Sequence, residues 1–85
     1  MTSQRIGEKQ GRTRGFGVML KTLRAREGLT QQELADRIGV TNSSVCLYEG
    51  GRRVPSRMTI SKISKVLNLT NDEFVLVLNV AEQHD

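Results

Sequence analysis

Apolar residues recur at helical spacing in several segments of this chain. The first group stands at positions i, i+4 and i+7 and consists of Phe16, Leu20 and Leu23. Residues at this spacing share one face of a helix, and that face can be buried against other elements. We therefore expect a first helix that begins at Phe16 and ends near Gly28.

The segment from Thr30 to Glu49 predicts two short helices, each with its own start signal. Thr30 and Glu33 have the spacing of a capping box, in which each side chain satisfies a free backbone N–H group of the other residue. Gly39 then supplies a residue that easily takes positive φ at a helix end. Thr41 caps the second helix, so a turn of about three to four residues joins the two.

The two faces of the second short helix differ in character. Val45 and Tyr48 stand at i and i+3 and are expected to point into the core. The opposite face is small and uncharged and consists of Asn42, Ser43, Cys46, Leu47 and Gly50. Two capped helices joined by a turn that holds a glycine are typical of a helix-turn-helix motif, which presents its second helix to DNA.

Two further helices are predicted after a loop from Gly50 to Pro55. Ser56 can cap a helix whose apolar face consists of Ile60, Ile63 and Leu67. Residues 70–73, Thr-Asn-Asp-Glu, have the spacing of another capping box and open the last helix. Residues 74–81 are more apolar than one buried helical face requires, and their β-branched side chains also suit a strand.

These patterns predict an all-α fold, a compact bundle of about five short helices. The 85 residues suit one domain with a modest core. Residues 1–15 contain four basic and four glycine or serine residues and no aromatic one, so they lack the apolar content to order themselves. We expect a flexible basic arm in residues 1–15, a helix-turn-helix domain in residues 16–74, and an extension of the last helix in residues 75–85.

The order and spacing of these signals resemble the Cro and phage-repressor (Xre-like) family. The residues that carry the resemblance are Gly28–Gln31, Glu33–Ala35, Ile38–Thr41, Val45 and Tyr48–Pro55. The match runs from about Phe16 to Phe74 and combines a capped helix, a turn glycine, a second helix, a basic loop and a proline. It implies a lambda-repressor-like fold and a sequence-specific DNA-binding transcriptional regulator, with double-stranded DNA as partner and no cofactor.

The charge distribution agrees with a phosphate-binding surface on one part of the chain. Residues 1–65 hold all 13 Lys and Arg against five acidic residues, a net charge of +8, and residues 66–85 hold four acidic residues and no Lys or Arg. The first part therefore attracts phosphates and the second does not.

In a helix-turn-helix protein, the second helix lies in the major groove and the first crosses the backbone. Asn42 is the strongest candidate for base recognition, because its amide can bond to adenine N6 and N7. The other candidate base contacts are Ser43, Cys46 and Leu47. Leu47 either touches a thymine methyl group or is an exposed leucine without a role, and Cys46 also suits a small filler beside the groove. Both depart from the polar residues usual on this face in the family.

Backbone contacts are expected from residues around the second short helix: Gln31, Thr41, Ser44, Arg52, Arg53 and Arg57. The resemblance places Gln31 and Arg52 at the usual phosphate-contacting positions. The alternative for Arg52 and Arg53 is a solvated pair. Arg12 and Arg14 of the arm either follow the DNA into an adjacent groove or belong to an inert tail.

The apolar side chains of residues 74–81 that the core does not bury are expected to pack against another surface. A second copy of the chain can supply it through a dimer interface at Phe74, Leu76 and Leu78, which would join two DNA half-sites. The alternatives are that these residues complete a small core or bind a second protein. The expected function is accordingly a repressor or restriction–modification controller on a two-fold operator, with a protein-interaction adaptor or antitoxin-like module as the alternative.

The remaining features narrow the class of protein. One cysteine cannot form an internal disulfide, and no apolar run approaches the roughly 20 residues that span a bilayer. The sequence shows no Cys/His cluster, carboxylate pair or nucleophile–base set, and Glu49 is expected to form a structural pair with a basic side chain such as Arg37. We expect a cytoplasmic, non-enzymatic protein with no metal site, no membrane contact and no small-molecule ligand.

Overall fold

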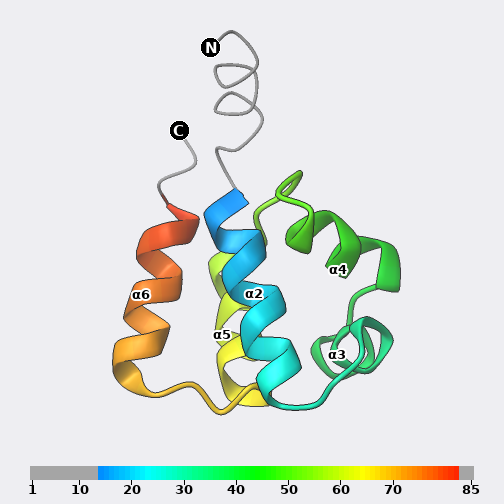
Figure 1. Cartoon of the computed structure of the whole chain (residues 1–85), viewed down its shortest axis with the longest axis horizontal. Coiled ribbons are helices and arrows are strands. Elements are labelled where there is room, and N and C mark those ends of the chain that lie inside the picture. Colours follow the sequence, from blue (N-terminus) through cyan, green and yellow to red (C-terminus); the bar gives the residue numbers. More distant parts are fainter. Residues whose placement is uncertain (1–13, 83–85) are drawn as a thin grey trace, which may run out of the picture.

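A computed structural model describes residues 14–82 of the chain, and these residues form five helices and no strand. The helices are α2 (Arg14–Arg26), α3 (Gln31–Ile38), α4 (Asn42–Glu49), α5 (Arg57–Val66) and α6 (Asn71–Ala81). Helix α2 stands in the middle, with α6 on one side, α3 and α4 on the other, and α5 behind it (Figure 1). The all-α prediction is confirmed, and residues 74–81 are helical rather than a strand.

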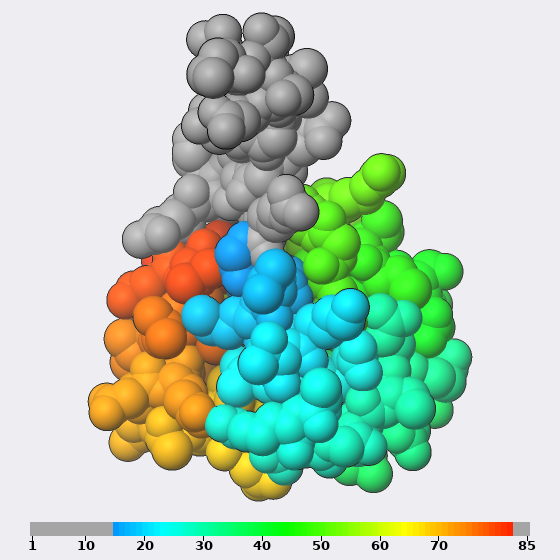
Figure 2. Space-filling view, viewed as in Figure 1, coloured from blue at the N-terminus to red at the C-terminus, as the bar shows by residue number. Residues whose placement is uncertain are grey.

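The first helix begins at Arg14, two residues before the predicted start. Most of the predicted arm, including Arg12, lies outside the described residues. Helix α2 packs beside α6, and Figure 2 shows the face of the molecule on which the two lie next to each other.

The predicted starts of the other four helices are confirmed. Thr30, Thr41, Ser56 and Thr70 are the N-cap residues of α3 to α6. In the capping box of α3, the Glu33 backbone N–H donates to Thr30 Oγ1 at 3.0 Å, and the Thr30 backbone N–H donates to Glu33 Oε1 at 2.8 Å. The bond from the Thr30 backbone is the main cause of a lowered pKa of Glu33. Each start is thus fixed by residues that are close in sequence.

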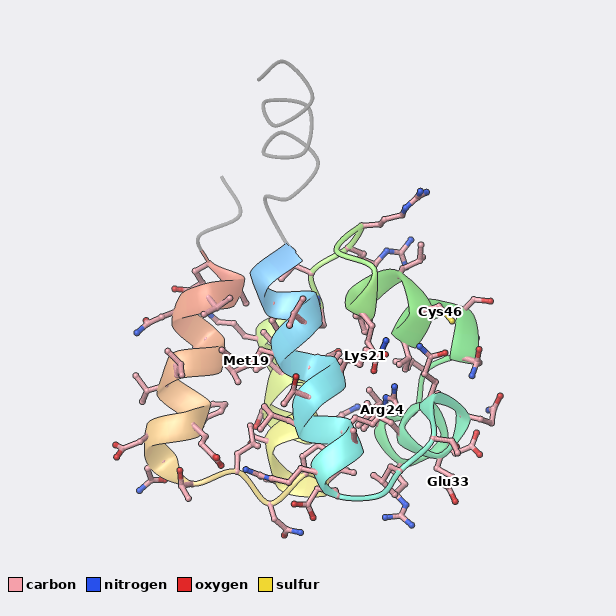
Figure 3. All side chains as sticks on the ribbon, viewed as in Figure 1. Met19, Lys21, Arg24, Glu33 and Cys46 are labelled. Atoms are coloured by element: carbon pink, nitrogen blue, oxygen red, sulfur yellow. The ribbon has the colours of Figure 1, made fainter. Side chains whose placement is uncertain are left out.

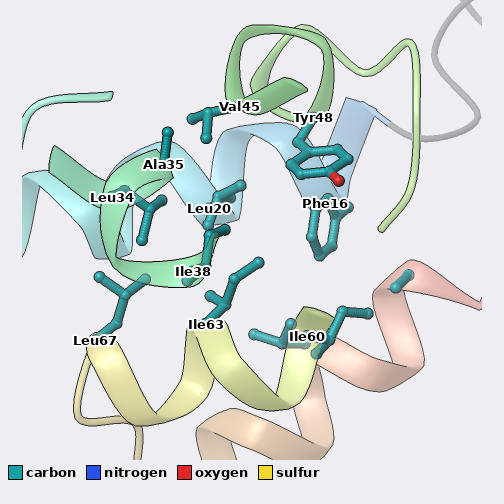
Figure 4. Close-up of a cluster of buried hydrophobic side chains, with 12 residues drawn as sticks. Phe16, Leu20, Leu34, Ala35, Ile38, Val45, Tyr48, Ile60, Ile63 and Leu67 are labelled. Atoms are coloured by element: carbon teal, nitrogen blue, oxygen red, sulfur yellow. The ribbon is translucent and has the colours of Figure 1, made fainter. Parts of the chain in front are cut away.

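Apolar side chains from all five helices form one core (Figure 4). Its buried members are Phe16, Leu20, Leu34, Ala35, Ile38, Val45, Tyr48, Ile60, Ile63, Leu67, Val77 and Ala81. Counted as whole residues, no polar or charged residue in the described part of the chain is buried, although the side chain of Glu49 is only 4% exposed. The core therefore holds the helices by apolar packing, and the polar interactions lie around its edge.

Two glycines set the position of α4. Gly39, in the turn between α3 and α4, has φ of 76°, as predicted for a helix end. Gly17 lies where α2 crosses the end of α4, and a Cβ atom on it would stand only 2.8 Å from the Tyr48 carbonyl oxygen. The backbone of α4 therefore rests directly on α2, and a side chain at position 17 would separate them.

Candidate nucleic-acid interface

Helix α4 has an inner and an outer face, as its residue spacing predicts. Val45 and Tyr48 are buried in the core. Outside the core lie the four residues that were predicted to contact bases: Asn42, Ser43, Cys46 and Leu47. Ser43 and Cys46 are exposed, and the other two are half-buried. The outer face is small and uncharged, so bases can approach this helix closely.

The N-terminus of α4 is closed by a pair of hydroxyl groups. Thr41 Oγ1 accepts from the Ser44 backbone N–H at 3.1 Å and donates to Ser44 Oγ at 3.1 Å. Both residues were predicted to contact the DNA backbone, and the structure places them at a helix N-terminus. The partial positive charge of that end favours an approaching phosphate.

The Glu49 carboxylate lies at the junction of three helices and pairs with a basic side chain as predicted, but the suggested partner, Arg37, is wrong. Its partner is Arg24 of α2, which donates from Nε to Oε2 at 2.5 Å and from Nη2 to Oε1 at 3.0 Å. The side chains of Arg24 and Glu49 are only 13% and 4% exposed. Arg24 stands seven residues after Gly17 and so lies on the same face of α2, the face that meets α4. Its hydrogen bond to Glu49 is the main cause of a raised pKa of Arg24.

The same carboxylate joins α4 to α3. Gln31 Nε2 donates to Glu49 Oε1 at 2.9 Å, and the Cys46 thiol donates to Gln31 Oε1 at 3.0 Å. Cys46 Sγ also lies 3.6 Å from Asn42 Oδ1. Three predicted DNA-contacting residues, Gln31, Asn42 and Cys46, are therefore brought together beside an ion pair.

Two residues of α2 that the sequence analysis did not single out belong to this region. Arg24 completes the ion pair with Glu49. Lys21 is exposed, and Figure 3 shows it on the side of α2 that faces α4. The spacing of Gly17, Lys21 and Arg24 places them on one face of a helix. The sequence alone does not show that this face meets α4.

The basic residues after α4 fall into two groups. Arg52 and Arg53 lie in the loop between α4 and α5 and are exposed. Arg57 is bonded to Glu82 beyond the end of α6, with Nε 2.9 Å from Oε2. Glu82 accepts hydrogen bonds from only two nitrogens of the exposed guanidinium, so Arg57 keeps further N–H groups that can reach a phosphate.

The residues predicted to form the dimer interface differ in burial. Phe74 and Leu78 are half-buried and pack against the core of their own chain. Leu76 and its neighbour Val75 are 52% and 53% exposed. On the adjacent α2, a shallow apolar pocket is lined by Gly15, Val18, Met19, Thr22 and Leu23. The apolar surface of α6 that remains open to a partner is therefore centred on Leu76 and Val75.

Within residues 14–82, no group of three or more His, Cys, Asp or Glu side chains is placed to hold a metal ion. No helix in this part of the chain is both long enough and apolar enough to cross a membrane.

A capped helix that packs on a second short helix across a glycine turn and exposes small polar side chains defines a helix-turn-helix domain. The comparisons with known proteins agree. A family model described as a helix-turn-helix domain matches residues 16–76. The chain belongs to the helix-turn-helix family of Xre-like transcriptional regulators.

Three relatives illustrate this family. The SPbeta prophage-derived HTH-type transcriptional regulator YonR of Bacillus subtilis is 37% identical over 57 residues, 67% of this chain and 53% of that protein. An HTH-type transcriptional regulator of Methanothermobacter thermautotrophicus is 34% identical over 61 residues, 72% of this chain and 88% of that protein. The HTH-type transcriptional activator BcrR of Enterococcus faecalis is 32% identical over 60 residues, 71% of this chain and 29% of that protein. The chain thus spans about half of the length of YonR.

Proposed function

We propose that this protein is a sequence-specific DNA-binding transcriptional regulator that inserts α4 into the major groove and lays α3 across the phosphate backbone. The observation that carries the proposal is the outer face of α4. It exposes small side chains beside a capped helix N-terminus, and the exposed Arg52 and Arg53 follow in the next loop. Such a surface combines close access to base edges with positive charge for phosphates.

The residues have different roles in this proposal. Asn42 reads adenine through its amide, while Ser43, Cys46 and Leu47 make the remaining base contacts. The residues assigned to the backbone are Gln31, Thr41, Ser44, Arg52, Arg53 and Arg57. These contacts fix the position of the protein on the duplex and carry no sequence information themselves.

We further propose that the protein binds as a homodimer to an operator with two-fold symmetry. One helix-turn-helix unit reads only a few base pairs, and a symmetric pair reads two half-sites. The exposed Leu76 and Val75 of α6 supply an apolar surface for the contact between copies.

Repression is the proposed direction of regulation, since an operator-bound protein blocks access of other proteins to the same DNA. Similarity to a prophage-derived regulator supports a phage-type context. The exposed α6 residues also motivate a second candidate, a protein-interaction adaptor that uses Leu76 and Val75 to bind another protein. Salt distinguishes the two, because log affinity for DNA falls with log salt by about 0.9 for each phosphate contact.

The test is enrichment of the purified protein on random-sequence duplex DNA at about 0.15 M salt, near physiological ionic strength. We expect an inverted repeat whose half-site centres lie about one helical turn apart. Recovery of no motif would contradict specific recognition and favour the adaptor, and any DNA binding that then disappears as salt rises would be non-specific attraction to the backbone.

A further inference from the structure

A chain of hydrogen bonds runs from Arg24 through Glu49 and Gln31 to Cys46. The chemistry of each group determines which partner donates and which accepts. A guanidinium group has only donors, so both oxygens of the Glu49 carboxylate accept from Arg24. Because a carboxylate in an ion pair has only acceptors, Gln31 must turn its nitrogen rather than its oxygen toward Glu49. One permanently charged side chain in α2 thereby determines the orientation of an amide at the start of α3.

The orientation of Gln31 in turn determines the role of Cys46. With Gln31 Nε2 on Glu49, Gln31 Oε1 points to α4 and accepts from the Cys46 thiol, whose Sγ lies 3.0 Å away. A thiol has one hydrogen, and the distance from Cys46 Sγ to Asn42 Oδ1 is longer, 3.6 Å. The thiol is therefore directed to Gln31, and Asn42 Oδ1 keeps its capacity to accept from a base amino group.

The same chain of bonds determines which atom of the Gln31 amide faces the DNA backbone. The Gln31 amide nitrogen carries two hydrogens, of which one is bonded to Glu49 and the other is left for a phosphate oxygen. A Gln side chain that is free to rotate can exchange its oxygen and nitrogen with almost no change of shape. In the reversed orientation, a carbonyl oxygen would face the phosphate and repel it.

We propose that Glu49 is a positioning residue for DNA recognition. Acting through Gln31 and Cys46, it fixes the direction of the hydrogen bonds where α3 meets α4. Gln31 thus offers an N–H group to the backbone, and Asn42 offers its oxygen to a base. This inference rests on the proposed function and deepens it, because it names the groups that prepare the binding surface before DNA arrives.

The first experiment is a double-mutant cycle on the duplex that the wild-type protein selects. Gln31→Met removes the amide with little change of length, and we expect affinity for every sequence to fall about tenfold, as for a bond to a charged phosphate. The salt slope should stay unchanged, since no cation is lost. Gln32→Met is the matched control, because Gln32 is exposed and its amide bonds only within α3, to Asp36 at 2.8 Å. It should bind like the wild type.

The second half of the cycle compares Gln31→Met in the wild-type and Glu49→Gln backgrounds and tests whether Glu49 acts through Gln31. We expect Glu49→Gln to weaken binding, and we expect Gln31→Met to cause no further loss when it is added to Glu49→Gln. Equal losses from Gln31→Met in both backgrounds would show that Glu49 acts independently of Gln31 and would overturn the proposal.

Cys46 provides a test that does not disturb the ion pair, because its side chain is exposed. Cys46→Ala removes the donor, and we expect a loss of about two- to fivefold, the usual size for a weak thiol hydrogen bond. Cys46→Ser keeps a donor of nearly the same size, so we expect it to bind more tightly than Cys46→Ala. If Cys46→Ala binds as tightly as Cys46→Ser, the proposed chain of bonds does not reach α4 and the inference fails.

Failure of this inference can be told from failure of the proposed function. A wild-type protein that selects no DNA sequence contradicts both. A wild-type protein that selects an inverted repeat, together with Gln31→Met and Cys46→Ala variants that bind it equally well, contradicts the positioning role alone.

Discussion

Gly17 of α2 and Glu49 of α4 approach so closely that a Cβ atom on Gly17 would stand 2.4 Å from the Glu49 carbonyl oxygen. The neighbour on that side is backbone, which cannot rotate away as a side chain can. The last turn of the proposed recognition helix can therefore pack directly on the backbone of α2, because Gly17 has no side chain. The same approach brings the Glu49 carboxylate within reach of Arg24.

Gly17→Ala is expected to destabilise the fold, because the new methyl group forces α2 and α4 apart. Overpacking of this kind costs about 1 to 3 kcal/mol and outweighs the gain in helix propensity. Gly15→Ala is the matched control in the same helix, since its Cβ would lie 3.6 Å from Val80 Cγ1, an ordinary contact. Urea unfolding of both variants checks the prediction, and equal stability of the two would contradict it.

Asn42→Ala tests base recognition. If Asn42 reads adenine, its removal should cost about 1 to 3 kcal/mol of binding free energy and relax the preference at one position in each half-site. Asn71→Ala, at the exposed start of α6, is the control and should bind normally. A uniform loss across all DNA sequences would show that Asn42 contacts the backbone instead.

Arg52→Ala tests a phosphate contact. We expect weaker binding to every sequence and a salt dependence whose slope is smaller by about 0.9, because one cationic contact is lost. Lys65→Ala removes the same charge from the exposed surface of the last turn of α5 and serves as the control. The check is binding measured at several salt concentrations, and an equal effect of both variants would indicate only general attraction.

Leu76→Glu tests the dimer. Leu76 is half exposed, so a charge there should leave the core intact but prevent a second copy from packing on α6. Sedimentation at micromolar concentration should show monomers. Met58→Glu places the same charge at another exposed apolar residue, on α5, and should leave the mass unchanged. A Leu76→Glu protein with the mass of the wild type would exclude this part of α6 from the interface.

Glu33→Gln tests the capping box of α3 through its pH dependence. Because hydrogen bonds from Thr30 lower the pKa of Glu33 in the folded protein, its charge stabilises the fold above the unfolded value of about 4.3. That contribution is lost as the pH falls through the lower, folded pKa. Unfolding at several pH values should therefore show a stability difference between wild type and Glu33→Gln that is largest near neutral pH and shrinks in acid. A difference independent of pH would contradict this role.

The parts of the structure that could be predicted from the sequence are those fixed by residues near one another in the chain. Thr30 and Glu33 are three residues apart, and their geometry follows from the start of a helix alone. The turn at Gly39 and the burial of Val45 and Tyr48 are local in the same sense. Helical spacing also placed Asn42 and Cys46 on one face of α4, before any contact between helices was known.

The pairs that were mispredicted or missed all depend on how helices cross. Arg24 and Glu49 are 25 residues apart, and so are Arg57 and Glu82. Nothing in the local pattern prefers Arg24 over Arg37 as the partner of Glu49, because both are basic residues near a helix end. The separation of Leu76 from Leu78 has the same origin, since only the packing of α6 on α2 and α5 decides which leucine remains exposed.

Cys46 is the one cysteine in the chain, and this makes it the natural attachment point for a maleimide dye. An alkylated sulfur has no hydrogen left to donate to Gln31, and a bulky dye on the outer face of α4 would stand where a base is expected. Protein labelled at this position is expected to bind DNA less well than the native domain, so its signal would not describe native binding. A reporter cysteine is better introduced on α5, for example as Lys65→Cys, in a Cys46→Ser background.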